Sequence, residues 1–188
     1  MADFLDRRAD MRICLVSQEY PPGADSGGIG SQTWLKAHGL ASKGHDVSVV
    51  CAGSLDEKSI RQEEFVRVIR IPGFHGRMRL NTEPARWLTW SAEVAATLAE
   101  LNSERPLELV DFPEYGGEGY LFLLNRTEWD YTPAVVHLHG PLVMFAHTMG
   151  WPKQDSEFYV AGIAMEGACF RLADAVYSSS QCSARWCA

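Results

Sequence analysis

Short apolar runs alternate along the chain with longer segments that have helical periodicity. The apolar runs predict six strands, at Arg12–Ser17, Asp46–Cys51, Phe65–Ile71, Leu107–Phe112, Pro133–Leu138 and Ala173–Ser178. The periodic segments predict helices at Ser31–Lys43, Ala85–Leu101, Gly116–Leu124 and Asp155–Leu172, and Gln181–Ala188 has the pattern of a further helix start. The charged stretch 55–64 is expected to be exposed, and the apolar/polar alternation of Phe65–Ile71 suits a strand near a sheet edge.

This alternation of strands and helices is typical of the α/β fold class. We predict a single Rossmann-like domain over residues 11–188, with a mostly parallel sheet covered by helices on both faces. Residues 1–10 are short and mixed in charge, and we expect them to be an N-terminal extension. Ligands of such sheets bind beyond the carboxyl ends of the strands, so the residues that follow each strand are the candidate site.

A glycine-rich loop follows the first predicted strand. The stretch Met11–Gly30 reads as a buried strand, then a loop that ends in Gly27, Gly28, Ile29 and Gly30, then a helix. Bare backbone N–H groups and the positive end of a helix dipole attract anions at such a place. The loop therefore predicts a phosphate-bearing ligand, although the glycines could also be simple turn residues.

Polar residues follow other predicted strands at the same edge. Tyr20 follows the first strand, Glu114 and Tyr115 follow Leu107–Phe112, and His139 and Gly140 follow Pro133–Leu138. This composition suits a polar, hydroxyl-rich ligand. The alternatives are that His139 is a structural histidine and that Glu114 caps the next helix.

Two further polar residues are assigned structural roles. His137 is expected to point to the sheet face opposite to His139. Glu166 lies within a predicted helix, where an ion pair between helices is the simpler interpretation.

Composition and charge argue against several classes of partner and location. The 188 residues carry a net charge of −7, which argues against a nucleic-acid partner. No apolar run is long enough for a transmembrane helix, and the N-terminus lacks the apolar core of a secretory signal. Five cysteines without a CxxC pair indicate reduced thiols, and we expect a cytoplasmic location. No set of metal ligands stands out.

Three familiar nucleotide and hydrolase motifs do not fit the chain. The nicotinamide fingerprint requires a third glycine and an acidic residue at the end of the second strand, and both are missing here. There is no Gly-Lys-Ser/Thr of a P-loop and no G-x-S-x-G elbow of a hydrolase.

Several motifs in register resemble a known family. They are Met11–Pro22 (MRICLVSQEYPP), Gly27–Gly30 (GGIG), Gly44–Val49 (GHDVSV), Val135–Pro141 (VVHLHGP), and the segment from Glu166 to Ser178 that ends in RLADAVYS. Together they resemble the N-terminal domain of family 4 (group 1) retaining glycosyltransferases of the GT-B fold. The resemblance covers about residues 11–188.

This resemblance implies a reaction and roles for the candidate residues. Such enzymes transfer a sugar from a nucleotide diphosphate sugar to a hydroxyl acceptor with retention of configuration. By resemblance, the amides of Gly27, Gly28 and Ile29 contact the donor diphosphate, and His139 lies near the transferred sugar as the catalytic residue. Acceptor binding falls to a set of rim residues, which are Tyr20, Glu114, Tyr115 and Gly140.

The resemblance also implies partners. We expect a nucleotide sugar and a hydroxyl acceptor (a glycan, lipid or small molecule) as substrates, no metal and no cofactor. The family's C-terminal donor domain is expected to be absent from this chain, so the isolated chain is predicted to be inactive, and membrane contact is expected to be peripheral and confined to the full-length enzyme. The alternative is a non-catalytic sugar- or nucleotide-binding module of the same fold.

Overall fold

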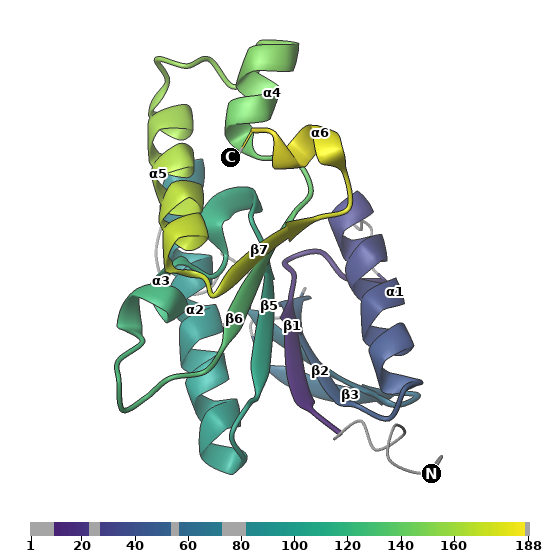
Figure 1. Cartoon of the computed structure of the whole chain (residues 1–188). Coiled ribbons are helices and arrows are strands. Elements are labelled where there is room, and N and C mark those ends of the chain that lie inside the picture. Colours follow the sequence, from purple (N-terminus) through teal and green to yellow (C-terminus); the bar gives the residue numbers. More distant parts are fainter. Residues whose placement is uncertain (1–9, 23–26, 54–56, 73–81, 187–188) are drawn as a thin grey trace, which may run out of the picture.

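The predicted alternation of strands and helices is present in the folded chain. The computed structural model describes residues 10–22, 27–53, 57–72 and 82–186 (Figure 1). Seven strands form one sheet, namely β1 (Arg12–Val16), β2 (Asp46–Gly53), β3 (Ser59–Glu63), β4 (Val66–Pro72), β5 (Leu109–Pro113), β6 (Ala134–Leu138) and β7 (Ala175–Ser178). The helices are α1 (Gly28–Ala41), α2 (Glu83–Glu104), α3 (Tyr120–Asn125), α4 (Leu142–Met149), α5 (Glu157–Leu172) and α6 (Gln181–Ala184), with a 3-10 turn η1 at Tyr115–Gly117.

The sheet is mostly parallel, and later strands lie on both sides of the first strand, β1. Its order is β3-β4-β2-β1-β5-β6-β7, and only β3 runs antiparallel to its neighbour among the described strands. The chain therefore builds outward from β1 in one direction and then in the other. Such a reversal opens a crevice at the carboxyl ends of the central strands, here β1 and β5.

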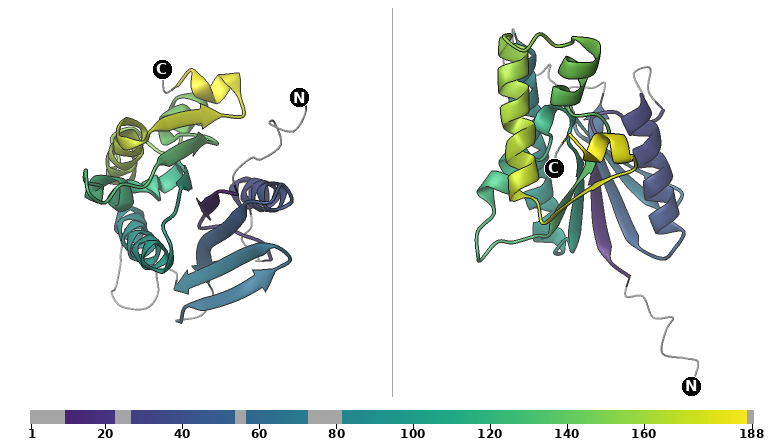
Figure 2. Two further views of the ribbon diagram at one scale, coloured as in Figure 1. Left: turned by 60° about the horizontal axis from the view of Figure 1, so that its bottom comes forward. Right: turned by 45° about the horizontal axis from the view of Figure 1, so that its top comes forward.

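Helices cover both faces of the sheet, as Figure 2 shows. On one face α1 packs against β1, β2 and β4, and on the other face α2, α3 and α5 pack together over the sheet. The larger core cluster includes Trp90, Val94 and Leu98, which lie on one side of α2 at helical spacing. The predicted α/β fold with a doubly covered, mostly parallel sheet is confirmed.

Four details differ from the expectation. The predicted helix Gly116–Leu124 is replaced by the turn η1 and the shorter helix α3, because Gly116 and Gly117 have positive φ angles. The charged stretch 55–64 contains the edge strand β3, which shows little apolar alternation because most of its residues are exposed. β4 lies next to this edge strand, as expected for a strand near a sheet edge. Residues Leu142–Met149 form α4, which was not predicted. Helix α1 begins at Gly28 rather than Ser31, so Gly28 and Ile29 belong to its first turn and not to the loop.

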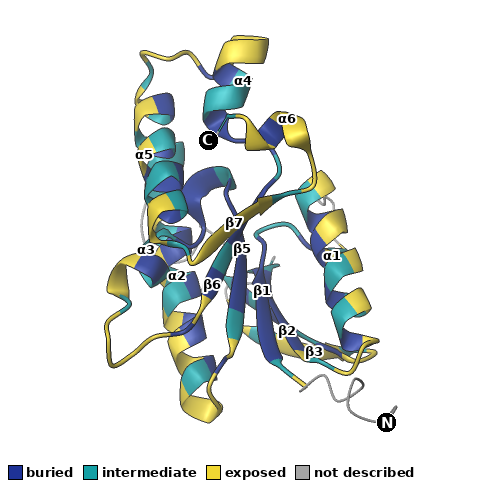
Figure 3. Ribbon diagram, in the orientation of Figure 1, coloured by how far each residue is buried: buried dark blue, intermediate teal, exposed yellow. Residues whose placement is uncertain are grey.

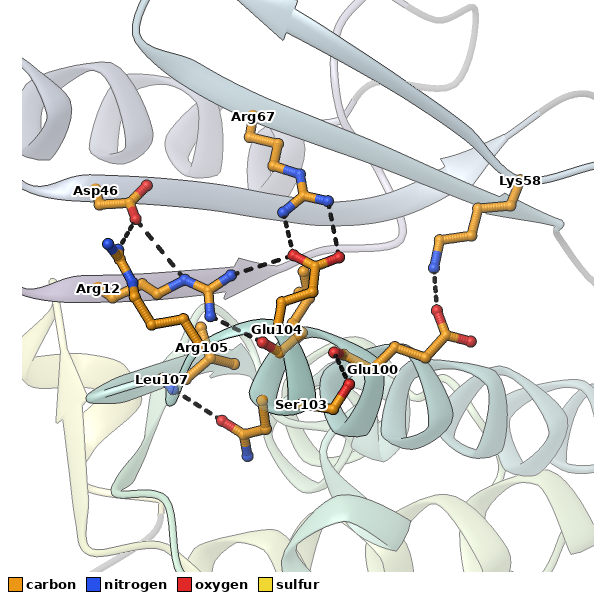
Figure 4. A network of polar contacts seen from close by, with 11 residues as sticks. Arg12, Asp46, Lys58, Arg67, Glu100, Ser103, Glu104, Arg105 and Leu107 are labelled. Atoms are coloured by element: carbon orange, nitrogen blue, oxygen red, sulfur yellow. Dashed lines mark hydrogen bonds and ion pairs between the residues drawn. The ribbon is translucent and has the colours of Figure 1, made fainter.

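The amino ends of the strands are joined by a network of ion pairs (Figure 4). Arg12 of β1 is only 5% exposed, and its Nη1 donates a hydrogen bond of 2.8 Å to the carbonyl oxygen of Leu101. Its guanidinium also lies 3.7 Å from the carboxylate of Asp46 and 3.6 Å from that of Glu104. Arg67 of β4 shares Glu104, at 2.6 Å. This network ties β1, β2 and β4 to the end of α2.

Candidate functional site

The first turn of α1 presents backbone N–H groups at the carboxyl end of β1. In an α-helix the first N–H groups have no acceptor within the helix, and the helix dipole makes this end attractive to anions. A carboxylate already occupies part of this position, because Oε2 of Glu19 accepts a hydrogen bond of 2.8 Å from the N–H of Gly27. The predicted amide donors Gly28 and Ile29 are the next two residues of the helix.

The glycines of this turn have different reasons to lack a side chain. A Cβ on Gly27 would lie 2.6 Å from Oε2 of Glu19, and one on Gly30 would lie 2.9 Å from the backbone C and O of Glu19. Among the described residues, none lies within 4 Å of a Cβ built on Gly28. Packing against the described residues therefore explains Gly27 and Gly30 but not Gly28. With respect to these residues, the space over Gly28 is open.

The turn that carries His139 and Gly140 is held by a buried carboxylate. Glu114 is 0% exposed, and its Oε1 accepts a hydrogen bond of 2.7 Å from the N–H of His139 and a second one from the N–H of Gly140. Burial raises the pKa of Glu114, against the lowering effect of these amides. The structure thus gives Glu114 a positioning role for the turn after β6.

Two other buried glutamates hold neighbouring segments in the same way. Oε2 of Glu118 accepts a 3.0 Å hydrogen bond from the N–H of Gln18, directly after β1, and a 2.8 Å bond from Nε1 of Trp90. Glu166 accepts hydrogen bonds from the N–H groups of Gly116, in η1, and Leu142, at the start of α4. Burial raises the pKa of Glu118 to about 7 and that of Glu166 to about 8. The expected ion pair of Glu166 between helices is therefore wrong, because its partners are backbone amides.

The prediction that His137 faces away from His139 is wrong. Their ring centroids are 4.1 Å apart. Residues two apart in a strand project to the same face, and the predicted alternation was applied with the wrong period. His137 is 5% exposed and stacks on Tyr177 of β7 with ring centroids 4.4 Å apart.

A lysine from α1 reaches this histidine pair. The Nζ of Lys36 lies 2.9 Å from Oδ2 of Asp111, 2.6 Å from the hydroxyl of Tyr177 and 3.2 Å from Nδ1 of His137. The Tyr177 hydroxyl also donates to Oδ2 of Asp111, at 2.6 Å. We call these four residues, Lys36, Asp111, His137 and Tyr177, the lysine network. It spans α1, β5, β6 and β7 beside the carboxyl edge of the sheet.

The sequence contains one signal that would have found most of this network. Asp111, His137 and Tyr177 each occupy the next-to-last position of a predicted strand that is otherwise largely apolar. In the sheet His137 pairs in register with Tyr177, and β5 and β6 are also neighbours. Polar side chains at matching positions of adjacent strands come to lie on one face. No sequence signal pointed to Lys36, which is 75 residues away from Asp111.

Both histidines are neutral at neutral pH. Burial, and then the positive charge of Lys36, lower the pKa of His137 to about 4. Burial likewise lowers the pKa of His139 to about 4, with smaller contributions from His137 and Lys36, while Asp111 acts in the opposite direction. A neutral imidazole can both donate and accept a hydrogen bond, which suits contact with hydroxyl groups.

The tyrosines predicted for the acceptor lie deeper than expected. Tyr20 is 3% exposed and packs in the core cluster under α1. Tyr115 is partly buried, and its ring meets Trp87 edge-on at 5.7 Å. Acceptor binding by Tyr20, Glu114, Tyr115 and Gly140 stays a prediction, and the burial of Tyr20 and Glu114 does not favour direct contact.

Two hollows in the described part of the structure lie away from the candidate residues. One, of about 620 Å³, lies at the opposite, amino edge, where Asp46 and Arg105 line it. Another, of about 490 Å³, lies between α2 and α3. Neither includes His139 or the first turn of α1. Across the described residues, no cluster of three or more His, Cys, Asp and Glu side chains suits a metal ion.

None of the helices in the described part of the chain is long and apolar enough to cross a membrane. The first nine residues of the expected N-terminal extension lie outside the described residues.

The chain matches one protein family by sequence. The profile described as glycosyl transferase 4-like domain matches residues 27–188. Among curated proteins, none matches the chain.

Solved glycosyltransferases share the fold at low sequence identity. Sucrose-phosphate synthase from Thermosynechococcus elongatus is similar with a TM-score of 0.58 and 16% identity, over 89% of this chain and 47% of that chain. An α,α-trehalose-phosphate synthase (UDP-forming) from Burkholderia vietnamiensis gives 0.59 and 16%, over 95% and 43%. The catalytic domain of starch synthase IV from Arabidopsis thaliana, bound to ADP and acarbose, gives 0.55 and 15%, over 70% and 34%.

The chain spans less than half the length of each of these proteins. The family match covers four of the five segments that carried the resemblance in the sequence, including the glycine turn, the His139 turn and the strand β7, and it begins after the fifth segment, Met11–Pro22. The chain therefore belongs to the glycosyl transferase 4-like domain family and has the fold of an N-terminal-type domain of the GT-B glycosyltransferases.

Proposed function

We propose that this domain is the acceptor-side half of a glycosyltransferase that moves a sugar from a nucleotide diphosphate sugar to a hydroxyl acceptor with retention of configuration. The observation that carries the proposal is the juxtaposition of two elements at one sheet edge: the first turn of α1, with open space over Gly28, and the His139 turn on β6. Two similar solved structures support the donor class, since one is bound to ADP and another is in complex with UDP.

The chemical roles follow from the charges that develop during transfer. As the sugar–phosphate bond breaks, negative charge grows on the departing diphosphate. The N–H groups of Gly28 and Ile29, at the positive end of α1, stabilise that charge. Neutral His139 holds a hydroxyl of the sugar or polarises the reacting centre. Glu114 fixes the turn that presents this imidazole.

A second domain completes the reaction in this proposal. The N-terminal-type domain supplies one side of a cleft, and a donor domain, in the same chain or as a partner, supplies the rest. The isolated chain therefore has little or no transferase activity. Transfer requires no metal and no cofactor, and the protein works in the cytoplasm.

A titration of the labelled chain tests the diphosphate site. In amide NMR spectra, UDP, ADP and GDP are each expected to move the signals of Gly28, Ile29 and His139. The control is Gly44, at the far end of α1, whose signal stays unmoved. Inorganic pyrophosphate should compete with all three nucleotides. An unchanged spectrum at millimolar nucleotide would contradict a donor contact on this domain.

Turnover assays separate this proposal from a non-catalytic binding module. The isolated chain is incubated with nucleotide sugars and acceptors, and release of nucleoside diphosphate is measured; robust release would overturn the half-enzyme proposal. When the domain is joined to a donor domain, the anomeric configuration of the product tests retention, and EDTA tests the absence of a metal requirement. A binding module would show nucleotide-dependent shifts but no transfer in either form.

A further inference from the structure

The ammonium group of Lys36 has a hydrogen-bond acceptor for each of its three N–H donors. A lysine ammonium carries three N–H donors and no lone pair. Its three short contacts go to Oδ2 of Asp111, the hydroxyl of Tyr177 and Nδ1 of His137. The hydroxyl of Tyr177 in turn donates to Asp111. This bond pattern leaves no freedom in the direction of the hydrogen bond to His137.

That direction decides which nitrogen of His137 carries the proton. Because Lys36 can only donate, Nδ1 of His137 must accept and therefore has no hydrogen. A neutral imidazole then carries its proton on Nε2. The ring itself is held flat against Tyr177, with an angle of 8° between the planes. The lysine network thus fixes both the orientation and the tautomer of His137.

His137 in turn is the neighbour of His139. The two ring centroids are 4.1 Å apart, and His139 is the less buried of the two residues. Two imidazolium rings at this distance would repel each other strongly, whereas a neutral, fixed ring supports its neighbour. The charged and titratable groups around the pair are Lys36 on α1, Asp111 on β5 and Tyr177 on β7.

We infer that Lys36, Asp111 and Tyr177 are positioning residues that fix His137 as the neutral Nε2–H tautomer, and that His137 holds the ring of His139 toward the ligand. The assignment of His139 to the ligand rests on the proposed function, but the tautomer of His137 does not. The network is a further part of the site: it connects the helix whose first turn meets the diphosphate to the strand that carries the catalytic histidine.

Long-range proton–nitrogen NMR of the imidazoles tests this inference on the chain itself. A nitrogen with a lone pair and a nitrogen with a proton differ widely in 15N shift, so each tautomer is read directly. The spectra of His137→Gln and His139→Gln assign the two rings. We expect the wild-type chain at pH 7 to show His137 with a bare Nδ1 and a protonated Nε2. A protonated Nδ1 on His137 overturns the inference, whatever the variants do.

Two variants of Lys36 test its donor-only ammonium group and its charge. Lys36→Gln replaces the ammonium with an uncharged amide that can donate or accept, so Nδ1 of His137 is no longer forced to accept and the two tautomers should mix. The pKa of His137 should rise from about 4 toward its ordinary value of 6.5 without reaching it, because burial is the larger cause of its low pKa. Lys36→Met removes both the donor and the charge, so the pKa should rise and the two tautomers should mix. Lys43→Met, in the exposed segment after α1, is the matched control and should change neither property.

The outcomes distinguish this inference from a purely structural role. If Lys36 only stabilises the fold, Lys36→Met lowers the melting temperature but leaves the tautomer and pKa of His137 unchanged, and the inference fails. If Lys36→Met does not fold, the spectrum of Lys36→Gln and the tautomer of His137 in the wild-type chain still test the inference. If the chain shows the expected tautomer of His137 but its spectrum does not respond to nucleotides, the inference about the lysine network stands and the proposed function is contradicted.

Discussion

At the amino edge of the sheet, buried Arg12 meets the carboxylates of Asp46 and Glu104, whereas at the carboxyl edge the buried Glu114, Glu118 and Glu166 meet backbone N–H groups. The first arrangement neutralises charge with charge and joins strands to a helix (Figure 4). The second uses carboxyl oxygens as hydrogen-bond acceptors that hold the ends of loops, and burial raises the pKa of all three acids.

The difference indicates what each edge is for. A raised carboxyl pKa means that the folded state disfavours the ionised form, which costs stability at neutral pH. Perturbed titratable groups of this kind concentrate where proteins position residues for chemistry. The amino edge therefore serves the stability of the domain, and the carboxyl edge accepts a cost in stability in order to fix the turns around His139 and Gly116. Figure 3 shows that the segment between β5 and α3 is mostly buried, whereas β7 is largely exposed.

The largest expected effect is the loss of Arg12. Arg12→Leu removes the buried hydrogen bond to the carbonyl oxygen of Leu101 and two ion pairs, whose half-exposed carboxylates keep Arg105 and Arg67 as partners, so we expect a loss of about 2–4 kcal/mol in the free energy of unfolding. Urea denaturation measures this loss. The matched control is Lys58→Met, which removes an exposed ion pair with Glu100 and should cost less than about 1 kcal/mol. Equal losses in the two variants would remove the distinction between buried and exposed pairs at this edge.

At the carboxyl edge the largest expected effect is on turnover. In a protein that joins this domain to a donor domain, His139→Ala should lose roughly 2–4 kcal/mol of transition-state stabilisation, as expected for one preorganised polar group. The ratio kcat/KM measures this effect, with the melting temperature as a check on folding. His45→Ala, at the amino edge, should leave kcat/KM unchanged. An unchanged kcat/KM in His139→Ala would exclude His139 from the site.

The next effect is a pH dependence of stability that comes from Glu166. Its pKa is raised from 4.5 to about 8 in the folded chain, so between these values the folded state binds more protons than the unfolded state. The free energy of unfolding contributed by this group therefore falls as the pH rises from about 5 to about 8. Glu166→Gln should remove this fall, which we expect to be on the order of 2–3 kcal/mol.

The difference between wild type and Glu166→Gln isolates this contribution. His137 and His139, with pKa values lowered from 6.5 to about 4, add stability as the pH rises through that range, but they do so in both proteins. Glu118 likewise contributes to both. Parallel stability curves for the two proteins from pH 5 to pH 8 would show that Glu166 is ionised at a normal pKa in the fold.

The smallest expected effect compares two glycines of the α1 turn. Gly30→Ala should cost about 1–3 kcal/mol of stability, because its Cβ would overlap the backbone of Glu19. Gly28→Ala should leave stability nearly unchanged, since its Cβ would meet none of the described residues within 4 Å. Gly28→Val, in the protein with a donor domain, should lower turnover far more than the melting temperature. A large fall in melting temperature with unchanged activity of the folded fraction would contradict the assigned role of Gly28.

The elements with strong periodicity were predictable, and those without it were not. β1, α1, β2, α2 and α5 follow from apolar runs and helical stripes that the core requires. β3 escaped because an edge strand that exposes most of its residues has no need of apolar alternation. α4 escaped because its eight residues follow directly from the buried His139 turn, without a polar boundary.

The site was predictable as an edge but not as a set of contacts. The residues that follow β1 and β6 were found from strand order alone, because parallel strands end at one edge. The roles of Glu114 and Glu166 were not, since a carboxylate that accepts backbone amides looks in sequence like one that binds a ligand or an ion. His137 was predicted on the wrong face of the sheet, because residues two apart in a strand project to the same face.

The sequence by itself determined the α/β alternation, the glycine turn before α1, the histidine turn after β6 and membership of the family, because these depend on local periodicity and on short motifs. Only the tertiary structure decided that Lys36, Asp111 and Tyr177 converge on His137. The last of these is 141 residues from Lys36 along the chain, and their contact depends on the strand order and on the position of α1 over the sheet. Hydrogen-bond direction and burial, which set the protonation of His137 and His139, exist only after that convergence.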